Sequence, residues 1–331
     1  MRTMPLALCR AFPLFALLGF SGLLGVAPAS AQEYPFKTVD VIVPSAVGNV
    51  ADVIGRAVLT EMQAKLSTAF VPTNVAAAGG AVGMQQFARR KPDGSTLALI
   101  SGSIPPLPFL IKDFTLDPVK DLAPICLFGI GQYVMFVHPD LPVRSLKEFI
   151  AYVRANPGKV NVGHQGGQNE LAINMLIKQG NLAITPIAYR GVPQVINATL
   201  AGELQMMFTS PLPMKQFVET GKLRPIAVFS DTPIPPELVT KGFENLPLMR
   251  SEVPEFRGPA PWFGLVGHAA MPRNLVTQLG DSCDAAVRTD AISSTIRRLG
   301  YASVKPGPAA IGDLIREDMV TLRQQAELLK K

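Results

Sequence analysis

The stretch that decides the fold reads Val39-Asp40-Val41-Ile42-Val43-Pro44-Ser45-Ala46-Val47-Gly48-Asn49-Val50-Ala51-Asp52. It begins as an apolar strand, passes through a short turn with a glycine, and ends as the first turn of a helix. Asn49 suits the N-cap position, and Asp52, three residues later, suits the acidic position of a capping box. The unpaired N–H groups at such a helix start, together with the positive end of the helix dipole, can bind a carboxylate.

A second stretch repeats this plan in the middle of the chain. The strand Val160–Gly163 leads into His164-Gln165-Gly166-Gly167-Gln168-Asn169, and a helix is predicted from Glu170. If the two turns face each other, they form a clamp for one ligand carboxylate. On local sequence alone, an ordinary connection between a strand and a helix is the favoured interpretation of the turn over residues 45–49.

The N-terminal segment has the features of a secretory signal peptide. Arg2 and Arg10 precede an apolar run that closes with Ala29-Ser30-Ala31. One proline and several glycines interrupt the run, so cleavage is favoured over membrane anchoring. We therefore predict a signal peptide over residues 1–31, cleavage after Ala31, and a periplasmic mature protein.

The charge balance and the cysteines exclude several classes of function. The chain has 31 Lys and Arg against 25 Asp and Glu; the signal peptide holds two arginines and no acidic residue, so the net charge falls from +6 to +4 on cleavage. No basic run accompanies this mild excess, so nucleic acid is not an expected partner. Cys126 and Cys283 lack zinc or CxxC spacing, which predicts no metal site and no cofactor. An exported protein could pair them, but we expect two buried free thiols.

The rest of the mature chain alternates strand-like and helix-like segments, which is typical of an α/β protein with largely parallel sheets. About 300 residues exceed one usual core, so two lobes are expected. The segment from Asp231 to Pro261 is rich in proline and charge and is predicted to be an irregular connection.

Short motifs along the chain resemble one known family, the solute-binding receptors of tripartite tricarboxylate transporters, often called Bug proteins. Their order and spacing carry the resemblance more than any one motif does. The motifs are Tyr34-Pro35, Val41–Pro44 leading to Asp52, Asn74 with Ala78-Gly79-Gly80, Lys91–Leu97, Asp117–Pro124, His138–Val143, Ala155–Asn161, Tyr189-Arg190-Gly191 and Trp262–Leu265.

This resemblance implies a periplasmic-binding-protein fold of type II, with two α/β lobes, two crossovers and a ligand cleft. Lobe 1 is mapped to residues 32–132 plus 255–331, and lobe 2 to residues 133–254. It also implies a monomeric, non-enzymatic receptor that closes on a small organic acid and delivers it to the permease subunits of such a transporter. A sensor that docks on a membrane signalling protein would use the same site and is an alternative.

The chain departs from the family pattern where the ligand is held. The family's first turn usually reads Pro-Gly-Gly, whereas here the stretch is Ala46-Val47-Gly48-Asn49; its second turn is usually rich in serine, whereas here it is bulkier and rich in amides. An aspartate that is common after a later strand is replaced by Thr209 or Ser210, which disfavours an amino acid ligand.

These considerations give one set of candidate ligand-binding residues. His164 could contact the ligand or be an ordinary loop histidine, and Arg190 could pair with a second carboxylate or be solvated. The set is Ser45, Ala46, Val47, Gly48, Asn49, Asp52, Ser101, His164, Gln165, Gly166, Gly167, Gln168, Asn169, Arg190 and Thr209.

A secreted hydrolase is the rival interpretation. The sequence has no GxSxG, SxxK, HExxH, P-loop or GxGxxG motif. A triad would have to combine Ser101 or Ser103 with His164 or His268, and no spacing favours that combination. We therefore predict no catalytic residues.

Overall fold

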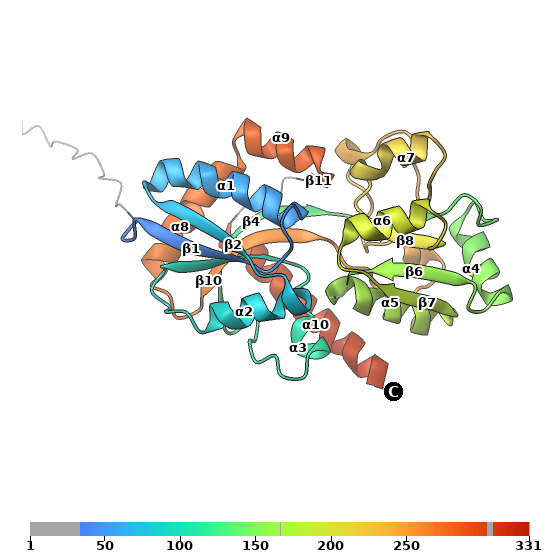
Figure 1. The fold of residues 1–331 in the computed structure, drawn as a ribbon, viewed down its shortest axis with the longest axis horizontal. Helices are drawn as coiled ribbons and strands as arrows, with labels where there is room; N and C mark the ends of the chain where they lie inside the picture. The colour runs from blue at the N-terminus through green and yellow to red at the C-terminus, as the bar shows by residue number, and fades with distance from the viewer. Residues whose placement is uncertain (1–33, 166, 303–306, 331) are drawn as a thin grey trace, which may run out of the picture. The chain divides into compact units, whose positions relative to one another are not determined.

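The computed structural model describes residues 34–165, 167–302 and 307–330 (Figure 1). The predicted signal peptide and its cleavage site lie outside these residues. Within them, no helix is both long enough and apolar enough to span a membrane.

The first sheet has six strands in the order β11-β4-β10-β3-β1-β2. Strands β1, β2 and β3 are parallel, while β10 runs antiparallel to β3 and β4. The carboxyl ends of β1 and β3 therefore lie at the same edge of the sheet. The strands are β1 (Thr38–Val43), β2 (Ala69–Asn74), β3 (Thr96–Ser101), β4 (Leu122–Gly131), β10 (Trp262–His268) and β11 (Tyr301–Ala302).

Helices cover both faces of this sheet. Val39, Val41 and Val43 of β1 belong to a core shared with one group of helices, and Ile42 belongs to the core on the opposite face. This split follows from the alternation of side chains along a strand. The first core involves α1 (Val50–Leu66), α8 (Arg273–Val287) and α9 (Asp290–Arg298), and the second involves α2 (Ala81–Ala88), α3 (Leu107–Leu110) and α10 (Pro308–Lys330).

The second sheet has five strands in the order β7-β6-β8-β5-β9. Strand β6 is parallel to both β7 and β8, and helices again pack on both faces. The elements are β5 (Val134–Val137), α4 (Leu146–Ala155), β6 (Val160–His164), α5 (Gly167–Gly180), β7 (Ile184–Ala188), α6 (Val192–Leu200), β8 (Met206–Thr209), α7 (Lys215–Glu219) and β9 (Arg224–Val228). The predicted α/β class is confirmed, whereas the exact lobe boundaries stay a prediction.

Two chain segments pass between the sheets, and they are hydrogen-bonded to each other. Gly131 donates its N–H to the carbonyl of Pro261 at 2.8 Å. The buried Ser230 hydroxyl accepts the N–H of Tyr133 at 2.8 Å and donates to the carbonyl of Pro259 at 2.6 Å. A single side chain therefore joins both crossings.

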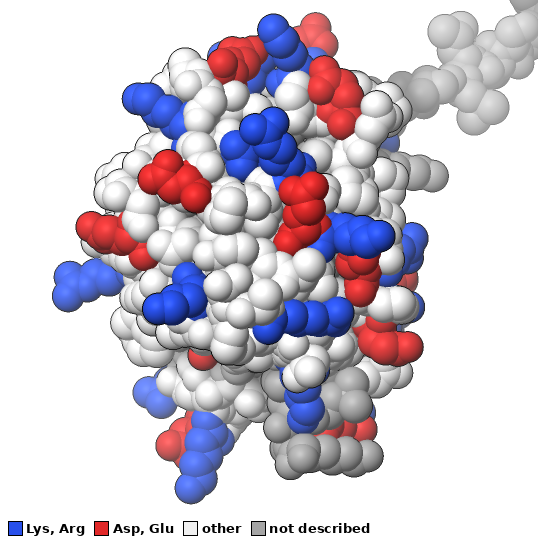
Figure 2. Space-filling model, turned by 90° about the vertical axis from the view of Figure 1, so that its right-hand side faces the viewer, with Lys and Arg blue, Asp and Glu red and all other residues white. Residues whose placement is uncertain are grey.

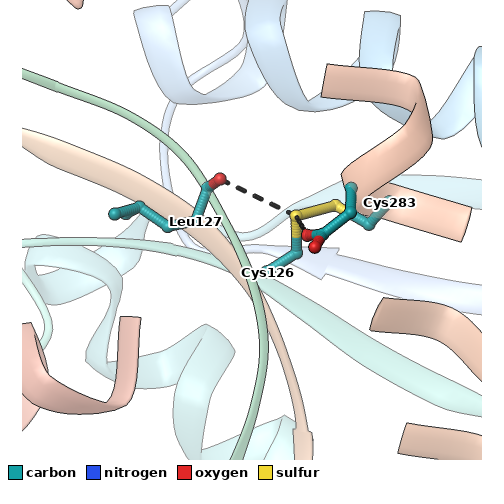
Figure 3. The surroundings of a disulfide bond; sticks show 4 residues. Cys126, Leu127 and Cys283 are labelled. Atoms are coloured by element: carbon teal, nitrogen blue, oxygen red, sulfur yellow. Dashed lines mark hydrogen bonds between the residues drawn. A yellow bond between two sulfur atoms is a disulfide. The ribbon is translucent and has the colours of Figure 1, made fainter. Parts of the chain in front are cut away.

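The expectation of free thiols is wrong, because Cys126 and Cys283 form a disulfide (Figure 3). Helix α8 packs on β4, which brings two fully buried cysteines to a Cα–Cα distance of 6.2 Å although 157 positions separate them in sequence. The carboxylate Oδ1 of Asp284 lies 3.6 Å from Cys126 Sγ. Burial raises the pKa of Asp284.

The surface shown in Figure 2 carries charges of both signs. Lys and Arg are interspersed with Asp and Glu on this side, without a broad region of one sign. A mixed surface of this kind does not offer the extended basic region that binding to a phosphate backbone requires.

Candidate functional site

The turn after β1 is built as the sequence predicts. Asn49 is the N-cap of α1, and its side-chain oxygen accepts the N–H of Ala51 at 3.2 Å. Gly48 has a φ of +79°, a conformation that a side chain would strain. The N–H of Gly48 donates to Asp52 Oδ2 at 2.9 Å, so this amide is used inside the turn.

Asp52 is the centre of a buried network that fixes this turn. Its Oδ1 accepts from Arg56 Nε at 2.8 Å and from Asn74 Nδ2 at 3.0 Å, and Asn74 Nδ2 also lies 3.0 Å from the carbonyl of Ser45. Burial alone would raise the pKa of Asp52, but the bonds from Gly48, Asn74 and Arg56 outweigh it and lower that pKa. The carboxylate is therefore ionised, and its charge is matched by Arg56.

Several polar groups of the turn remain for a ligand. Across the part of the chain that the structure describes, no hydrogen bond is recorded from the N–H groups of Ala46 and Val47, whereas Asn49 donates to the carbonyl of Ala46 at 3.1 Å. The hydroxyl of Ser45 is buried without a partner. Val47 is 77% exposed at the tip. The arrangement can hold an anion with backbone amides, without a cationic side chain.

Ser101 lies at the same edge of the sheet, at the carboxyl end of β3. Its hydroxyl is 2.8 Å from that of Ser103, and the N–H of Gly102 donates to the carbonyl of Trp262 at 3.2 Å. His268, another residue of the hydrolase interpretation, accepts the N–H of Ala270 at its Nδ1 (3.2 Å). These bonds do not assemble a catalytic triad. The described residues also contain no cluster of three or more metal-ligating side chains.

The turn after β6 differs from the prediction in length. His164 is the last residue of β6, and α5 begins at Gly167, three residues earlier than predicted. Gln168 and Asn169 thus lie in the first helical turn, where backbone N–H groups need no acceptor inside the helix. Gln165 lies between the two elements, and Gly166 lies outside the described residues.

The other candidates on this sheet lie at the ends of neighbouring strands. Thr209 is the last residue of β8, and Arg190 follows β7 with an exposed side chain. His164 is only 6% exposed. Burial lowers the pKa of His164 although Glu170 acts in the opposite direction, so its imidazole is neutral at neutral pH.

The carboxyl edges of the two sheets meet at Gln168. A Cβ placed on Gly102 would lie 2.7 Å from Gln168 Oε1, so the first turn of α5 rests on the loop after β3. A hydrogen bond of 2.7 Å between the hydroxyls of Ser210 and Tyr301 also joins the two sheets. The structure thus brings Gln168 against Gly102, the residue after Ser101, although the sequence analysis placed Ser101 and Gln168 in separate lobes.

Sequence reasoning missed several residues of this region. Arg56 had a signal, because it stands four residues after Asp52 on one helix. No sequence signal pointed to Gly102, to Tyr301 or to the hydrogen bonds of Asn74, because their contacts come from distant segments.

Comparison with known proteins identifies the family to which this chain belongs. Residues 54–325 match the family described as the tripartite tricarboxylate transporter family receptor, TctC. The chain belongs to this family. TctC proteins are periplasmic substrate-binding receptors that work with tripartite transporters and are not enzymes.

Individual proteins that resemble this chain cover nearly the same length. BugT of Bordetella pertussis is 26% identical, over 92% of this chain and 94% of its own. The periplasmic binding protein BugD is 26% identical with a TM-score of 0.75, over 90% of this chain and 98% of its own. MatC of Rhodopseudomonas palustris, solved with malate, has a TM-score of 0.77 at 22% identity over 88% of this chain and 100% of its own; at that identity the likeness shows the fold.

Proposed function

We propose that this chain is an exported receptor that captures a small organic carboxylate and delivers it to the permease subunits of a tripartite tricarboxylate transporter. Family membership supports the receptor role, and the arginines and apolar run before Ala31 support export. Related folds have been solved with malate and with adipate. Both of these ligands are carboxylates of the size that two turns could enclose.

One observation carries the proposal. The turn over residues 45–49 offers unpaired amides at the start of α1, a helix of 17 residues. Gln168, at the start of α5 in the second sheet's half, lies against Gly102, which follows β3 at the same edge of the first sheet as this turn. A ligand carboxylate bound there would gain hydrogen bonds from backbone groups and from the helix dipole. The charge of Asp52 is balanced by Arg56, and its carboxylate also accepts hydrogen bonds from Gly48 and Asn74, so its repulsion of a ligand carboxylate is reduced.

A thermal-shift screen of mono- and dicarboxylates tests the receptor role. A ligand at 100 times its Kd should stabilise the folded protein by about 2.7 kcal/mol. The mature N-terminus, determined by mass spectrometry of protein from the periplasm, should be Gln32. Flat melting curves with every acid, together with turnover of an ester, would favour the hydrolase instead.

Substitution of Val47 tests the position of the site. Val47→Asp places a negative charge at an exposed tip and should weaken carboxylate binding at least tenfold without changing the melting temperature of the empty protein. Val47→Asn is the matched neutral control and should bind nearly as well as the wild type. Val320→Asp adds the same charge to another exposed valine, on α10, and should have no effect. Equal affinity for all three variants would remove this turn from the site.

A further inference from the structure

Trp262, the only tryptophan of the chain, stands where the second crossing enters β10. Its side chain is 1% exposed and lies in the core that the first sheet shares with α10. The indole Nε1 donates its N–H to Asp318 Oδ2 on α10 at 2.8 Å. A buried indole N–H needs an acceptor, so this bond fixes the orientation of the ring.

The carboxyl group of Asp318 is an unusual choice of acceptor for one indole. Within the described part of the chain, its one recorded hydrogen bond comes from Trp262, and no ion pair is recorded for it. Burial raises the pKa of Asp318 to about 7, the bond from Trp262 opposes this rise, and the charge of Glu317 adds to it. A carboxyl group is costly to bury without a cation, so its presence here favours a role beyond stability.

The backbone of Trp262 holds the loop that follows β3. Its carbonyl accepts the N–H of Gly102 at 3.2 Å, one bond beyond the pairing of β10 with β3. Gly102 stands between the half-buried Ser101 and Ser103, whose hydroxyls lie 2.8 Å apart. Each hydroxyl has one hydrogen and this contact uses one of the two, so the pair keeps one donor among its recorded bonds. The pair lies at the sheet edge that carries the turn over residues 45–49.

The same loop also packs beneath that turn. Ile104 belongs to the core that contains Trp262. A Cβ placed on Gly80 would lie 3.4 Å from Ile104 Cδ1 and 2.6 Å from the carbonyl oxygen of Pro44, the residue that precedes the turn. A shift of the indole would therefore disturb both the serine pair and the base of the turn.

We propose that Asp318 is a positioning residue for the carboxylate site: its bond to the indole of Trp262 holds the loop after β3, so that the hydroxyl pair of this loop donates its remaining hydrogen to the ligand. This inference rests on the proposed function, because it concerns the same site. Asp318 acts through Trp262 and not by contact with the ligand. Because coupling between two positions is reciprocal, a ligand held by the hydroxyl pair also alters the surroundings of the indole.

The fluorescence of Trp262 in the mature protein tests this coupling, because no other tryptophan contributes to the emission. Malate, succinate and adipate are the probes, and the one that binds the wild type most tightly is used throughout. Saturation with this acid should change the emission of the wild type, and Asp318→Leu should abolish the change. Asp318→Asn keeps an acceptor for the indole and should restore it.

Isothermal titration calorimetry with the same acid separates positioning from stability. Asp318→Leu should weaken the affinity about fivefold or more, because the competent loop is less populated, whereas Asp318→Asn should change it about twofold or less. Tyr34→Phe is the matched control. It removes another buried hydrogen bond, to the carbonyl of Gly94 at the opposite edge of the same sheet, and should lower the melting temperature without changing the affinity. Added to Ser101→Ala, Asp318→Leu should cause little further loss of affinity.

The outcomes separate this inference from the proposed function. If the bound acid leaves the emission of Trp262 unchanged, or if Asp318→Leu lowers only the melting temperature, Asp318 is merely structural and the inference is refuted, while the carboxylate receptor stands. If no acid, in this set or in the wider thermal-shift screen, binds the wild type, the proposed function fails and the inference fails with it. Should Asp318→Leu not fold, as judged by its melting curve, the emission of the wild type on saturation decides alone.

Discussion

Replacement of Asp52 by asparagine removes the charge that organises the first turn while keeping the shape of the side chain. In the wild type, Oδ2 accepts the N–H of Gly48 and Oδ1 accepts from Arg56 and Asn74. An asparagine has one oxygen and one NH2 group, so in either orientation at least one of these donors faces another donor.

The magnitude follows from the burial of each partner. Asp52 is 2% exposed, so a lost bond to its carboxylate costs about 1.5 to 3 kcal/mol. The side chain of Arg56 is 41% exposed, so its ion pair is screened by water and contributes only about 0.2 to 1 kcal/mol. We expect Asp52→Asn to lower the free energy of unfolding by about 3 kcal/mol and to weaken carboxylate binding, because the turn is no longer held in place.

Urea denaturation of the two variants Asp52→Asn and Arg56→Gln measures how much each substitution lowers the free energy of unfolding. Arg56→Gln should cost about 1 kcal/mol or less, because Gly48 and Asn74 still bond the carboxylate. The reasoning would be refuted if Asp52→Asn lay within about 0.5 kcal/mol of the wild type, or if Arg56→Gln were equally destabilising. Since hydrogen bonds lower the pKa of Asp52, its contribution should be complete at neutral pH and be lost as the pH falls below about 4.

Three further measurements test other parts of the structure. Replacing Cys126 and Cys283 by alanine should lower the free energy of unfolding by about 2 to 4 kcal/mol, because the bond closes a loop of 157 positions; unchanged urea midpoints with and without reductant would contradict it. Burial raises the pKa of Asp318 to about 7, so the native state binds more protons than the unfolded state between about pH 4 and 7, and stability should fall as the pH rises through that window. Asp318→Asn should remove this fall, as seen in melting temperatures from pH 4 to 8. Tyr301→Phe leaves the buried Ser210 hydroxyl unpaired and should cost about 1 kcal/mol, whereas no change in the urea midpoint would show that this bond is dispensable.

Local signals in the sequence were sufficient for the first turn but not for the second. Asn49 caps α1 as predicted, because capping depends only on residues a few positions apart. Helix α5 begins three residues before the predicted Glu170, because Gly167 and Asn169 have weak helix preferences that gave no clear start. The alternation of apolar residues was enough to predict the α/β class.

Contacts between distant segments could not be predicted. The disulfide between Cys126 and Cys283 depends on how α8 packs on β4, and the approach of Gln168 to Gly102 depends on how the two sheets meet. Neither is encoded in spacing. The two sets of candidate ligand-binding residues stay a prediction, and the approach of Gln168 to the loop after β3 became visible only in three dimensions.

The Ser230 hydroxyl, which bonds Tyr133 on one crossing and Pro259 on the other, limits how the protein can open. Two separate linkers could each twist independently and would allow many relative orientations of the sheets. Linkers joined by a common side chain must bend together, so opening is expected to follow a single axis. A receptor of this construction would return to the same geometry in every binding cycle, and its selectivity would be set by the pocket rather than by variable closure.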